Sequence, residues 1–309
     1  MKSWLPLFCA CALALPGADA LAAETVGTER PLLAFARERE AKRAAEEFAP
    51  ARSSGLREAL HQRDQARVPR DEDCAGSLGA ARFAELHAGV AIAHQFEGDF
   101  AGAATEYRRA IACRPRDANL LAALAGVLFD ARDYAGTRVA ITAALAIDPR
   151  SVTVNRLAGN LDFVEERWAD AIARFRYVAS SDGDRTQAGY GQLMFWLAQR
   201  RAGVAKPEFI ARTPGDGWPQ PLLLYMRGEY PEADLIRPIE EGDSDSNTQA
   251  NTSTDERLCE ALFYVGEDLW ARGELDTARD YFAALVNIKV IYFLEHGIAL
   301  AEIAKLRER

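Results

Sequence analysis

The stretches EGDFAGAATEYRRAIACRP, residues 97–115, and ARDYAGTRVAITAALAIDP, residues 131–149, carry the same pattern 34 positions apart. Each opens with a short polar turn and continues with an Ala-rich run that favours helix. Each then ends at a proline, Pro115 or Pro149, which cannot continue a helix. The two stretches therefore predict that one structural unit is repeated along the chain.

Three units align when they start at Ala84, Ala118 and Val152, and each has small and bulky residues at fixed positions. The small residues are Ala91, Ala125 and Gly159, then Ala103, Thr137 and Ala171; the bulky ones are Phe100, Tyr134 and Trp168, then Tyr107, Ile141 and Phe175. In the third unit Gly183 stands in place of the closing proline. We expect two antiparallel helices per unit, with small residues where they cross and bulky residues filling the gap.

This pattern resembles the tetratricopeptide repeat, which has the same length and the same order of Gly or Ala, Ala, aromatic residue and Pro. The resemblance implies an all-α helical solenoid, with three repeats over residues 83–183. A fourth copy follows out of phase at residues 262–286, LFYVGEDLWARGELDTARDYFAALV. Residues 257–309 are therefore predicted to form a C-terminal repeat and a closing helix.

Residues 184–239 are predicted to be a degenerate helical segment between the third and fourth repeats. It contains an apolar helix, QAGYGQLMFWLAQRRAG at residues 187–203, and shorter helical pieces around residues 208–212 and 221–228. Residues 240–256, EEGDSDSNTQANTSTDE, hold six acidic residues and no basic one. That composition predicts a solvated, flexible acidic loop.

Residues 1–22 are typical of a secretory signal peptide. Lys2 is followed by a short apolar run and by Ala-Leu-Ala at the end, which predicts a soluble periplasmic protein. Cys9 and Cys11 lie inside the apolar run, so no lipid-anchor cysteine is predicted. No later apolar stretch is long enough to be a transmembrane segment.

Residues 23–82 are predicted to be an N-terminal arm and linker. We expect a helix near residues 31–48, a weaker one near residues 55–65, and disorder over part of the segment. Basic and acidic residues alternate along the first helix, which predicts a solvated helix with salt bridges rather than a binding patch.

The order of these segments, ending in a helix that begins FLEHGIALAEI, resembles the NlpI family of periplasmic tetratricopeptide lipoproteins. The resemblance covers residues 83–306 and is strongest over residues 262–302. It implies a non-enzymatic, dimeric adaptor that links a C-terminal processing protease to peptidoglycan hydrolases. It does not extend to membrane tethering, because the lipid-anchoring cysteine of that family is missing.

We expect the first helices of the repeats to line a concave groove that binds other proteins. The residues predicted there are Glu85, Ile92, Gln95, Phe96, Asn119, Phe129, Asp130, Arg156, Asn160 and Phe163. Arg156 and Asn160 lie one turn apart and are similar to the pair with which some tetratricopeptide domains hold a C-terminal carboxylate. The other members of that clamp are missing, so a solvated polar stripe is the alternative.

The predicted mature chain has three cysteines, Cys74, Cys113 and Cys259, an odd number for an oxidising compartment. Cys74 precedes the first repeat helix and Cys113 closes the second, and these two ends meet in an antiparallel pair. A Cys74–Cys113 disulfide is one expectation, and a buried Cys113 with a free Cys74 is the other. There is no C-x-x-C pattern, and no cofactor is predicted.

Two sets of residues raise the possibility of acid–base or metal chemistry. Glu295 and His296 are adjacent, but neighbours on a helix point about 100° apart, which favours a packing histidine. His87 and His94 are seven residues apart, which also favours packing or surface roles. An enzyme with a metal site at either place is the less favoured hypothesis.

The net charge of −9 argues against nucleic acid as a partner. The closing helix carries more Ile and Leu than one supporting repeat can cover. We therefore expect it to pack in a homodimer interface or against the degenerate middle helices. The favoured function is a periplasmic adaptor, and the alternative is a structural subunit of an outer-membrane secretion or pilus-assembly machine.

Overall fold

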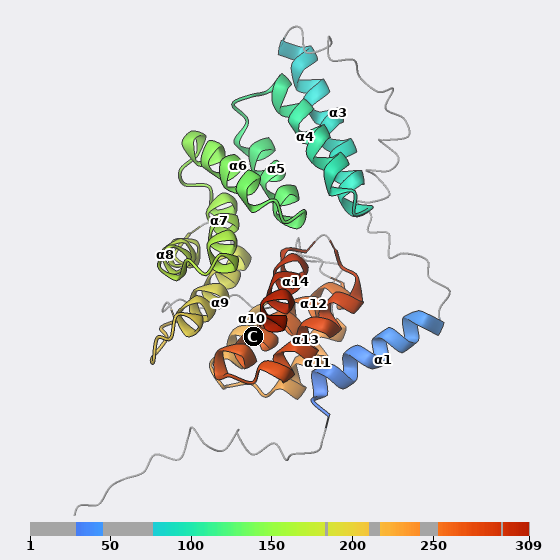
Figure 1. The fold of residues 1–309 in the computed structure, drawn as a ribbon, viewed down its shortest axis with the longest axis vertical. Coiled ribbons are helices and arrows are strands. Elements are labelled where there is room, and N and C mark those ends of the chain that lie inside the picture. The colour runs from blue at the N-terminus through green and yellow to red at the C-terminus, as the bar shows by residue number, and fades with distance from the viewer. Residues whose placement is uncertain are drawn as a thin grey trace, which may run out of the picture.

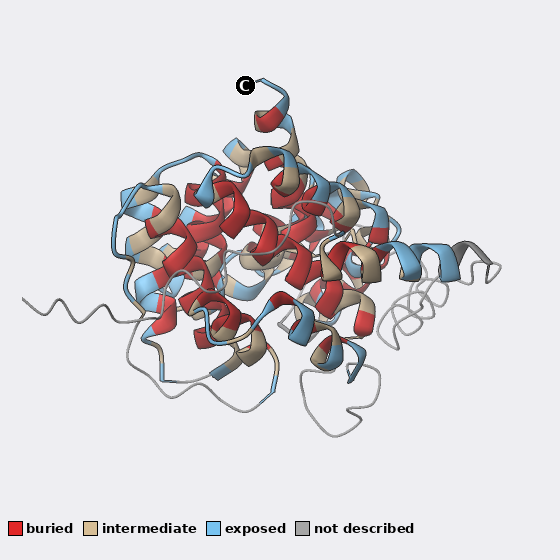
Figure 2. Cartoon of the chain, turned by 90° about the horizontal axis from the view of Figure 1, so that it is seen from below, coloured by how far each residue is buried: buried red, intermediate tan, exposed pale blue. Residues whose placement is uncertain are grey.

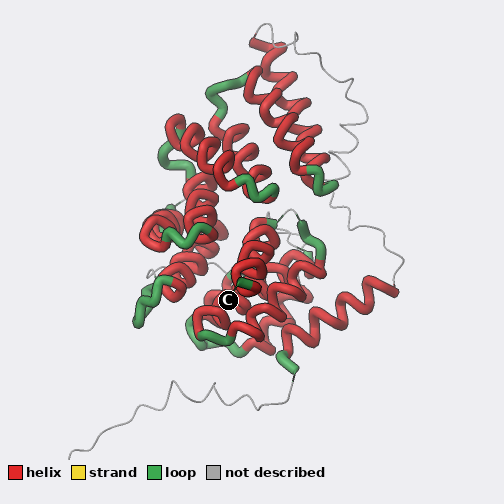
Figure 3. Tube along the Cα trace, in the orientation of Figure 1, coloured by secondary structure: helices red, strands yellow, loops and turns green. Residues whose placement is uncertain are grey.

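The computed structural model describes residues 29–45, 77–182, 185–209, 217–241, 253–291 and 293–308. Every regular element within these ranges is a helix (Figure 3). Consecutive helices pack against one another along the chain, which confirms the predicted all-α helical repeat solenoid (Figure 1). None of the described helices is both long and apolar enough to span a membrane.

Three helix pairs build the first part of the solenoid. They are α3 (Ser77–Phe96) with α4 (Phe100–Cys113), α5 (Ala118–Asp130) with α6 (Tyr134–Ile147), and α7 (Val152–Val164) with α8 (Trp168–Ala179). The second helix of each pair begins on the aromatic residue of the repeat, as the alignment implies. The first helix α3 starts at Ser77, before the predicted boundary at residue 83, so part of the expected linker is helical.

The turn inside each pair has the same backbone conformation in all three units. Gly98, Arg132 and Glu166 occupy the same repeat position and have φ of 78°, 60° and 58°. The side chains of Asp99 and Asp133 then accept a backbone N–H from the first turn of the next helix. A left-handed residue other than Gly costs about 1 kcal/mol, so only the first unit has the residue best suited to the turn.

The second part of the solenoid begins with α9 (Arg185–Arg201), which packs along α8. The remaining elements are α10 (Gln220–Met226), η2 (Glu232–Leu235), α11 (Ile236–Glu240), α12 (Thr254–Arg272), α13 (Leu275–Ile288) and α14 (Leu294–Arg307). Gly273, between α12 and α13, has φ of 86° and repeats the left-handed turn of the first units. The predicted helix at residues 221–228 is α10, whereas Glu208 and Phe209 lie in a loop.

The predicted acidic loop is shorter than residues 240–256. Glu240 ends α11, and Ser253 starts the next helix through a capping box with Glu256. Residues 242–252 lie outside the described residues, as do the predicted signal peptide and the predicted helix at residues 55–65.

The predicted N-terminal helix is α1 (Pro31–Ala45), but it is not simply a solvated arm. Leu32, Leu33 and Ala36 are buried, and α1 packs on α13 at the far end of the chain (Figure 1). Arg39 forms an ion pair of 2.7 Å with Asp255 at the start of α12. The arm therefore belongs to the C-terminal part of the structure.

Close helix crossings in the third and fourth repeats depend on glycine. A Cβ atom added to Gly159 would lie 2.7 Å from Cε1 of Phe175, and one added to Gly266 would lie 2.9 Å from Cε1 of Phe282. Both aromatic rings are fully buried in the continuous core that Figure 2 shows in red. The small and bulky residues of the repeat therefore meet as predicted.

We predict that Gly159→Ala lowers the free energy of unfolding by about 1–3 kcal/mol, because the added methyl overpacks the crossing with Phe175. The matched control is Gly126→Ala in α5, where nothing lies within 4 Å of the added atom. That change should raise stability by up to about 1 kcal/mol through helix propensity. Urea unfolding measures both, and equal effects from the two variants would contradict the packing account.

Candidate functional site

The concave side of the second and third repeats is occupied by the closing helix α14. It packs on α12 and α13 and also on the first repeat helices α5 and α7 (Figure 1). At its start, a Cβ added to Gly297 would lie 3.6 Å from Phe129 of α5. At its end, Lys305 Nζ donates to the carbonyl oxygen of Val164 at 2.7 Å. The chain thus covers part of the surface where the groove is predicted.

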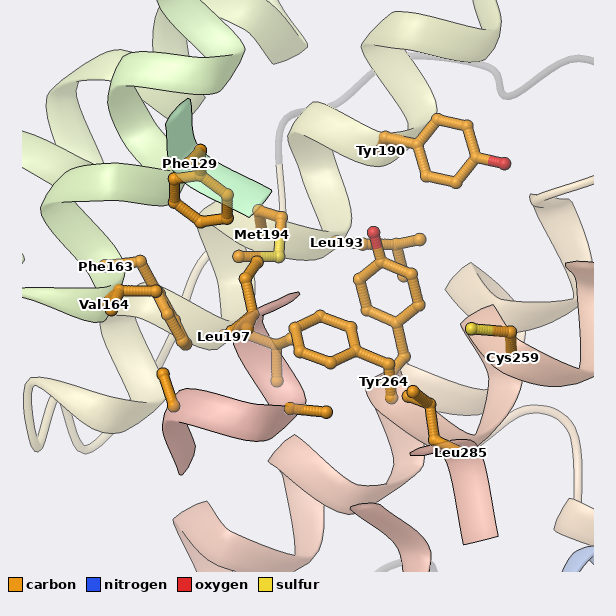
Figure 4. Close-up of a cluster of buried hydrophobic side chains, with 14 of the residues drawn as sticks. Phe129, Phe163, Val164, Tyr190, Leu193, Met194, Leu197, Cys259, Tyr264 and Leu285 are labelled. Carbon is orange, nitrogen blue, oxygen red and sulfur yellow. The ribbon is translucent and has the colours of Figure 1, made fainter. Parts of the chain in front are cut away.

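Three of the predicted groove residues are not accessible. Phe129, Asn160 and Phe163 are 1%, 3% and 0% exposed. Phe129 and Phe163 belong to the same buried cluster as Leu197 of α9 and Tyr264 of α12 (Figure 4). The expectation that these three side chains line an open groove is therefore corrected, because α14 and its neighbouring helices enclose this region.

The other predicted groove residues keep some exposure. Glu85, Ile92 and Asn119 are exposed, and Gln95, Phe96, Asp130 and Arg156 are half-buried. Gln95 Nε2 donates to Asp130 Oδ2 at 3.3 Å, so the structure brings these two predicted residues together. The exposed members of the predicted groove therefore lie on α3 and at the beginning of α5.

The half-buried Arg156 acts electrostatically on two carboxyls of its own chain. We define the Arg156 cluster as Arg156, Tyr190, Trp218, Glu260, Tyr264 and Glu295. Glu260 accepts hydrogen bonds from Tyr190 Oη at 2.8 Å and from Trp218 Nε1. Arg156 lies close enough to Glu260 and Glu295 to lower the pKa of both carboxyls in part. Asn160, the second residue of the predicted clamp, is buried, so the two side chains do not form an open carboxylate-binding pair.

Burial governs the protonation of this region. It raises the pKa of Glu260 to about 8, and the nearby charge of Glu295 adds to the increase. Burial likewise raises the pKa of Asp130 to about 7, again with a contribution from Glu295. The pKa of Glu295 itself is raised by burial, although Arg156 and a hydrogen bond with Tyr264 oppose the increase. Burial therefore favours the protonated form of each of these three carboxyls.

The adjacent Glu295 and His296 have different surroundings. Glu295 belongs to the Arg156 cluster, where its partners come from α7 and α12. His296 is also buried, and burial lowers the pKa of its imidazole, as expected for a packing histidine. Figure 4 shows that Tyr264, the hydrogen-bond partner of Glu295, lies among apolar side chains of α9 and α12.

A second charged cluster joins α9, α12 and α14. Arg201 forms ion pairs with Glu267 and, at 2.8 Å, with Glu302, and its guanidinium lies 4.1 Å from the centre of the Trp270 ring. The three charged side chains are 4%, 0% and 0% exposed. Lys305 adds a second cation 2.8 Å from Glu302. We call these five residues the Arg201 cluster.

Sequence reasoning missed most members of both clusters. Glu260 and Glu267 stand seven residues apart in an otherwise apolar run of α12, and Arg201 ends the apolar run of α9. Charges that interrupt or border apolar helical stretches are the available signal, because a buried charge needs a partner. Their partners could not be named, since they come from helices distant in sequence.

The two histidines of the first repeat have separate carboxylate partners. His87 Nδ1 lies 2.7 Å from Glu106, and His94 Nδ1 lies 2.9 Å from Asp99. Within the described ranges, no group of three or more His, Cys, Asp or Glu side chains is placed to hold a metal ion. His87 is buried, as a packing histidine would be, whereas His94 is half-buried beside Asp99.

Cys113 is disulfide-bonded, and Cys259 is free and buried. The partner of Cys113 and the predicted partner Cys74 both lie outside the described residues. The Cys74–Cys113 pairing therefore stays a prediction. Burial raises the pKa of the Cys259 thiol well above its usual value, which disfavours the reactive thiolate.

Comparison of the chain with protein-family models gives no match. What the structure itself adds is the repeated helix pair and the recurring left-handed turn. The resemblance to the NlpI family rests on the sequence pattern and remains a hypothesis.

We predict that Arg201→Met lowers the free energy of unfolding by about 3–5 kcal/mol, because it leaves the buried Glu267 without its cation. The control is Arg279→Met, which removes an exposed ion pair of 2.8 Å with Asp276 in the same part of the fold. That control should change stability by at most about 1 kcal/mol. Guanidinium unfolding measures both, and a small loss for Arg201→Met would show that the cluster is not a structural anchor.

Proposed function

We propose that the protein is a non-enzymatic periplasmic adaptor that binds envelope proteins and links a C-terminal processing protease to peptidoglycan hydrolases. The observation that supports binding most directly is the exposed apolar side chain of Ile92 on α3, which is 38% accessible. Repeat solenoids use such curved surfaces to hold protein partners. The choice of partners follows from the resemblance to the NlpI family.

The open surface has the composition of a small binding site. Ile92 and Phe96 lie one turn apart on α3, so their side chains share a face of the helix. The exposed Glu85 and Asn119 add polar groups on the same first helices. Apolar side chains supply most of the binding free energy in such sites, while polar groups fix orientation. A partner segment with one apolar side chain and hydrogen-bond donors on either side of it suits this surface.

The disulfide at Cys113 supports an oxidising compartment, as the apolar N-terminal stretch also does. A homodimer remains part of the proposal, but α14 no longer argues for it. Ile298, Ala299 and Leu306 are buried within the same chain, against α5, α7, α12 and α13. Contacts within the same chain therefore account for the many apolar residues of the closing helix.

We predict that Ile92→Glu removes binding of the envelope protease and the cell-wall hydrolases, because a carboxylate replaces the apolar anchor. The control is Val139→Glu. Val139 is even more exposed, at 72%, and lies on α6, the second helix of the second repeat. Crosslinking in the native periplasm, followed by mass spectrometry, compares the partners of the three proteins.

The expected result is that the wild-type and Val139→Glu proteins capture the same protease or hydrolase, and Ile92→Glu does not. Identical partners for all three proteins would contradict binding at the α3 surface. Stable isolation with a membrane-embedded complex, in place of soluble enzymes, would favour the alternative function as a structural subunit.

A further inference from the structure

A cleft lies between the N-terminal helix α1 and helix α13 of the last repeat. Its volume is about 200 Å³, and α12 contributes to its lining only through Asp255. Sites that hold small-molecule ligands or cofactors usually measure about 300–1,000 Å³. The cleft is therefore small for a cofactor and has the size for a side chain of a protein partner.

Ion pairs hold the two walls of the cleft together. Arg30, just before α1, pairs at 3.1 Å with the buried Glu232 of η2, whose carboxylate also accepts the backbone N–H of Leu32 at 3.0 Å. Further along α1, Arg39 pairs at 2.7 Å with Asp255. The cleft is thus preformed, and a partner meets an ordered surface there.

Apolar side chains form the floor of the cleft. Leu33 and Ala36 of α1 and Ile288 of α13 line it and are buried. Ala284, which also lines it, is half-buried. Such a floor favours contact with the aliphatic part of a side chain, because the contact removes apolar surface from water.

The rim of the cleft carries two carboxylates that lack a cation. Glu40 on α1 and Asp280 on α13 both line the cleft and are exposed. Among the described residues, no ion pair joins either of them to a basic side chain. Both arginines of the cleft are neutralised already, Arg39 by its α12 partner and Arg37 by Glu29, 2.7 Å away. Negative charge therefore remains above the apolar floor.

We propose that the cleft between α1 and α13 is a docking site for a basic side chain, arginine or lysine, of a partner protein. The aliphatic stem of that side chain lies on the apolar floor, and its cation is held by the carboxylates of Glu40 and Asp280. Charge complementarity identifies this occupant. An acidic side chain would be repelled, and a purely apolar one would leave both carboxylates without a cation.

This inference deepens the proposed adaptor function, and it rests on that function for the partner being an envelope protein. An adaptor that links two proteins needs two separate binding surfaces. Helix α3 and the cleft between α1 and α13 lie toward opposite ends of the molecule (Figure 1). Partners held at these two surfaces would therefore not overlap.

Titration of the full chain with defined peptides tests the docking site. The probe is the peptide acetyl-Gly-Leu-Arg-Leu-Gly-amide, and the comparison peptide has glutamate in place of arginine. NMR spectra of the isotope-labelled protein should show dose-dependent shifts at Ala283 and Asn287, which line the cleft, with the arginine peptide alone. The affinity should fall as salt is added, because the two carboxylates are exposed.

A charge-neutral variant and a matched control locate the binding. Glu40→Gln/Asp280→Asn should raise the Kd of the arginine peptide on the order of 10-fold, because it removes two exposed ion pairs. The control Glu38→Gln/Asp276→Asn makes the same changes on the same two helices, at exposed positions outside the cleft. Its Kd should equal that of the wild-type protein.

Absence of binding by the arginine peptide would overturn the proposal. Equal losses of affinity in the two double variants would also overturn it, because they would indicate general attraction to an acidic protein. Light scattering provides a further check: a dimer that Glu40→Gln/Asp280→Asn abolishes would identify a second copy as the occupant and contradict the proposal. Ile92→Glu should bind the peptide as the wild-type protein does, so failure of the α3 surface and failure of the cleft are separate results.

Discussion

The burial of Arg201 between Glu267 and Glu302 is the interaction on which the arrangement of the second half of the molecule depends. A guanidinium removed from water is tolerated only when carboxylates neutralise it and other contacts surround it. Here the carboxylates come from α12 and α14, and Trp270 covers the cation. These three helices must therefore assemble together, and the position of α14 in the concave groove is one consequence.

The repeat part of the fold could be predicted from the sequence because its determinants are local. Helix pairs, turns and the contact of Gly159 with Phe175 recur at a fixed spacing, and each unit mainly packs on its neighbours. The end of the solenoid follows other rules. The Ile and Leu residues of α14 indicate that it needs a covering surface, but they do not indicate which one. The covering surface is determined by the curvature of successive repeats, which places α5 and α7 next to the closing helix.

Only part of the candidate site could be predicted from the sequence, again because only local spacing is visible there. Gln95, Asp130 and Arg156 were assigned to the groove from repeat position alone, and the structure places Gln95 beside Asp130. The effect of Arg156 on the pKa of Glu295 could not be inferred, because nothing in the periodicity connects the third repeat with the last helix. Ser253 and Glu256 have the spacing of a capping box in the sequence, but the acidic residues around them favour a loop.

The account joins a scaffold, an open surface on α3 and a groove that its own last helix fills. Its central claim is that α14 lies on the repeats of the same chain, and the ion pair of 3.4 Å between Lys305 and Glu166 offers a direct test. Carbodiimide coupling converts such a contact into an amide bond, and mixing light with isotope-labelled protein separates links within one chain from links between chains. The account predicts a Glu166–Lys305 link within single chains. A link found only between light and heavy chains, or its absence, would contradict the claim.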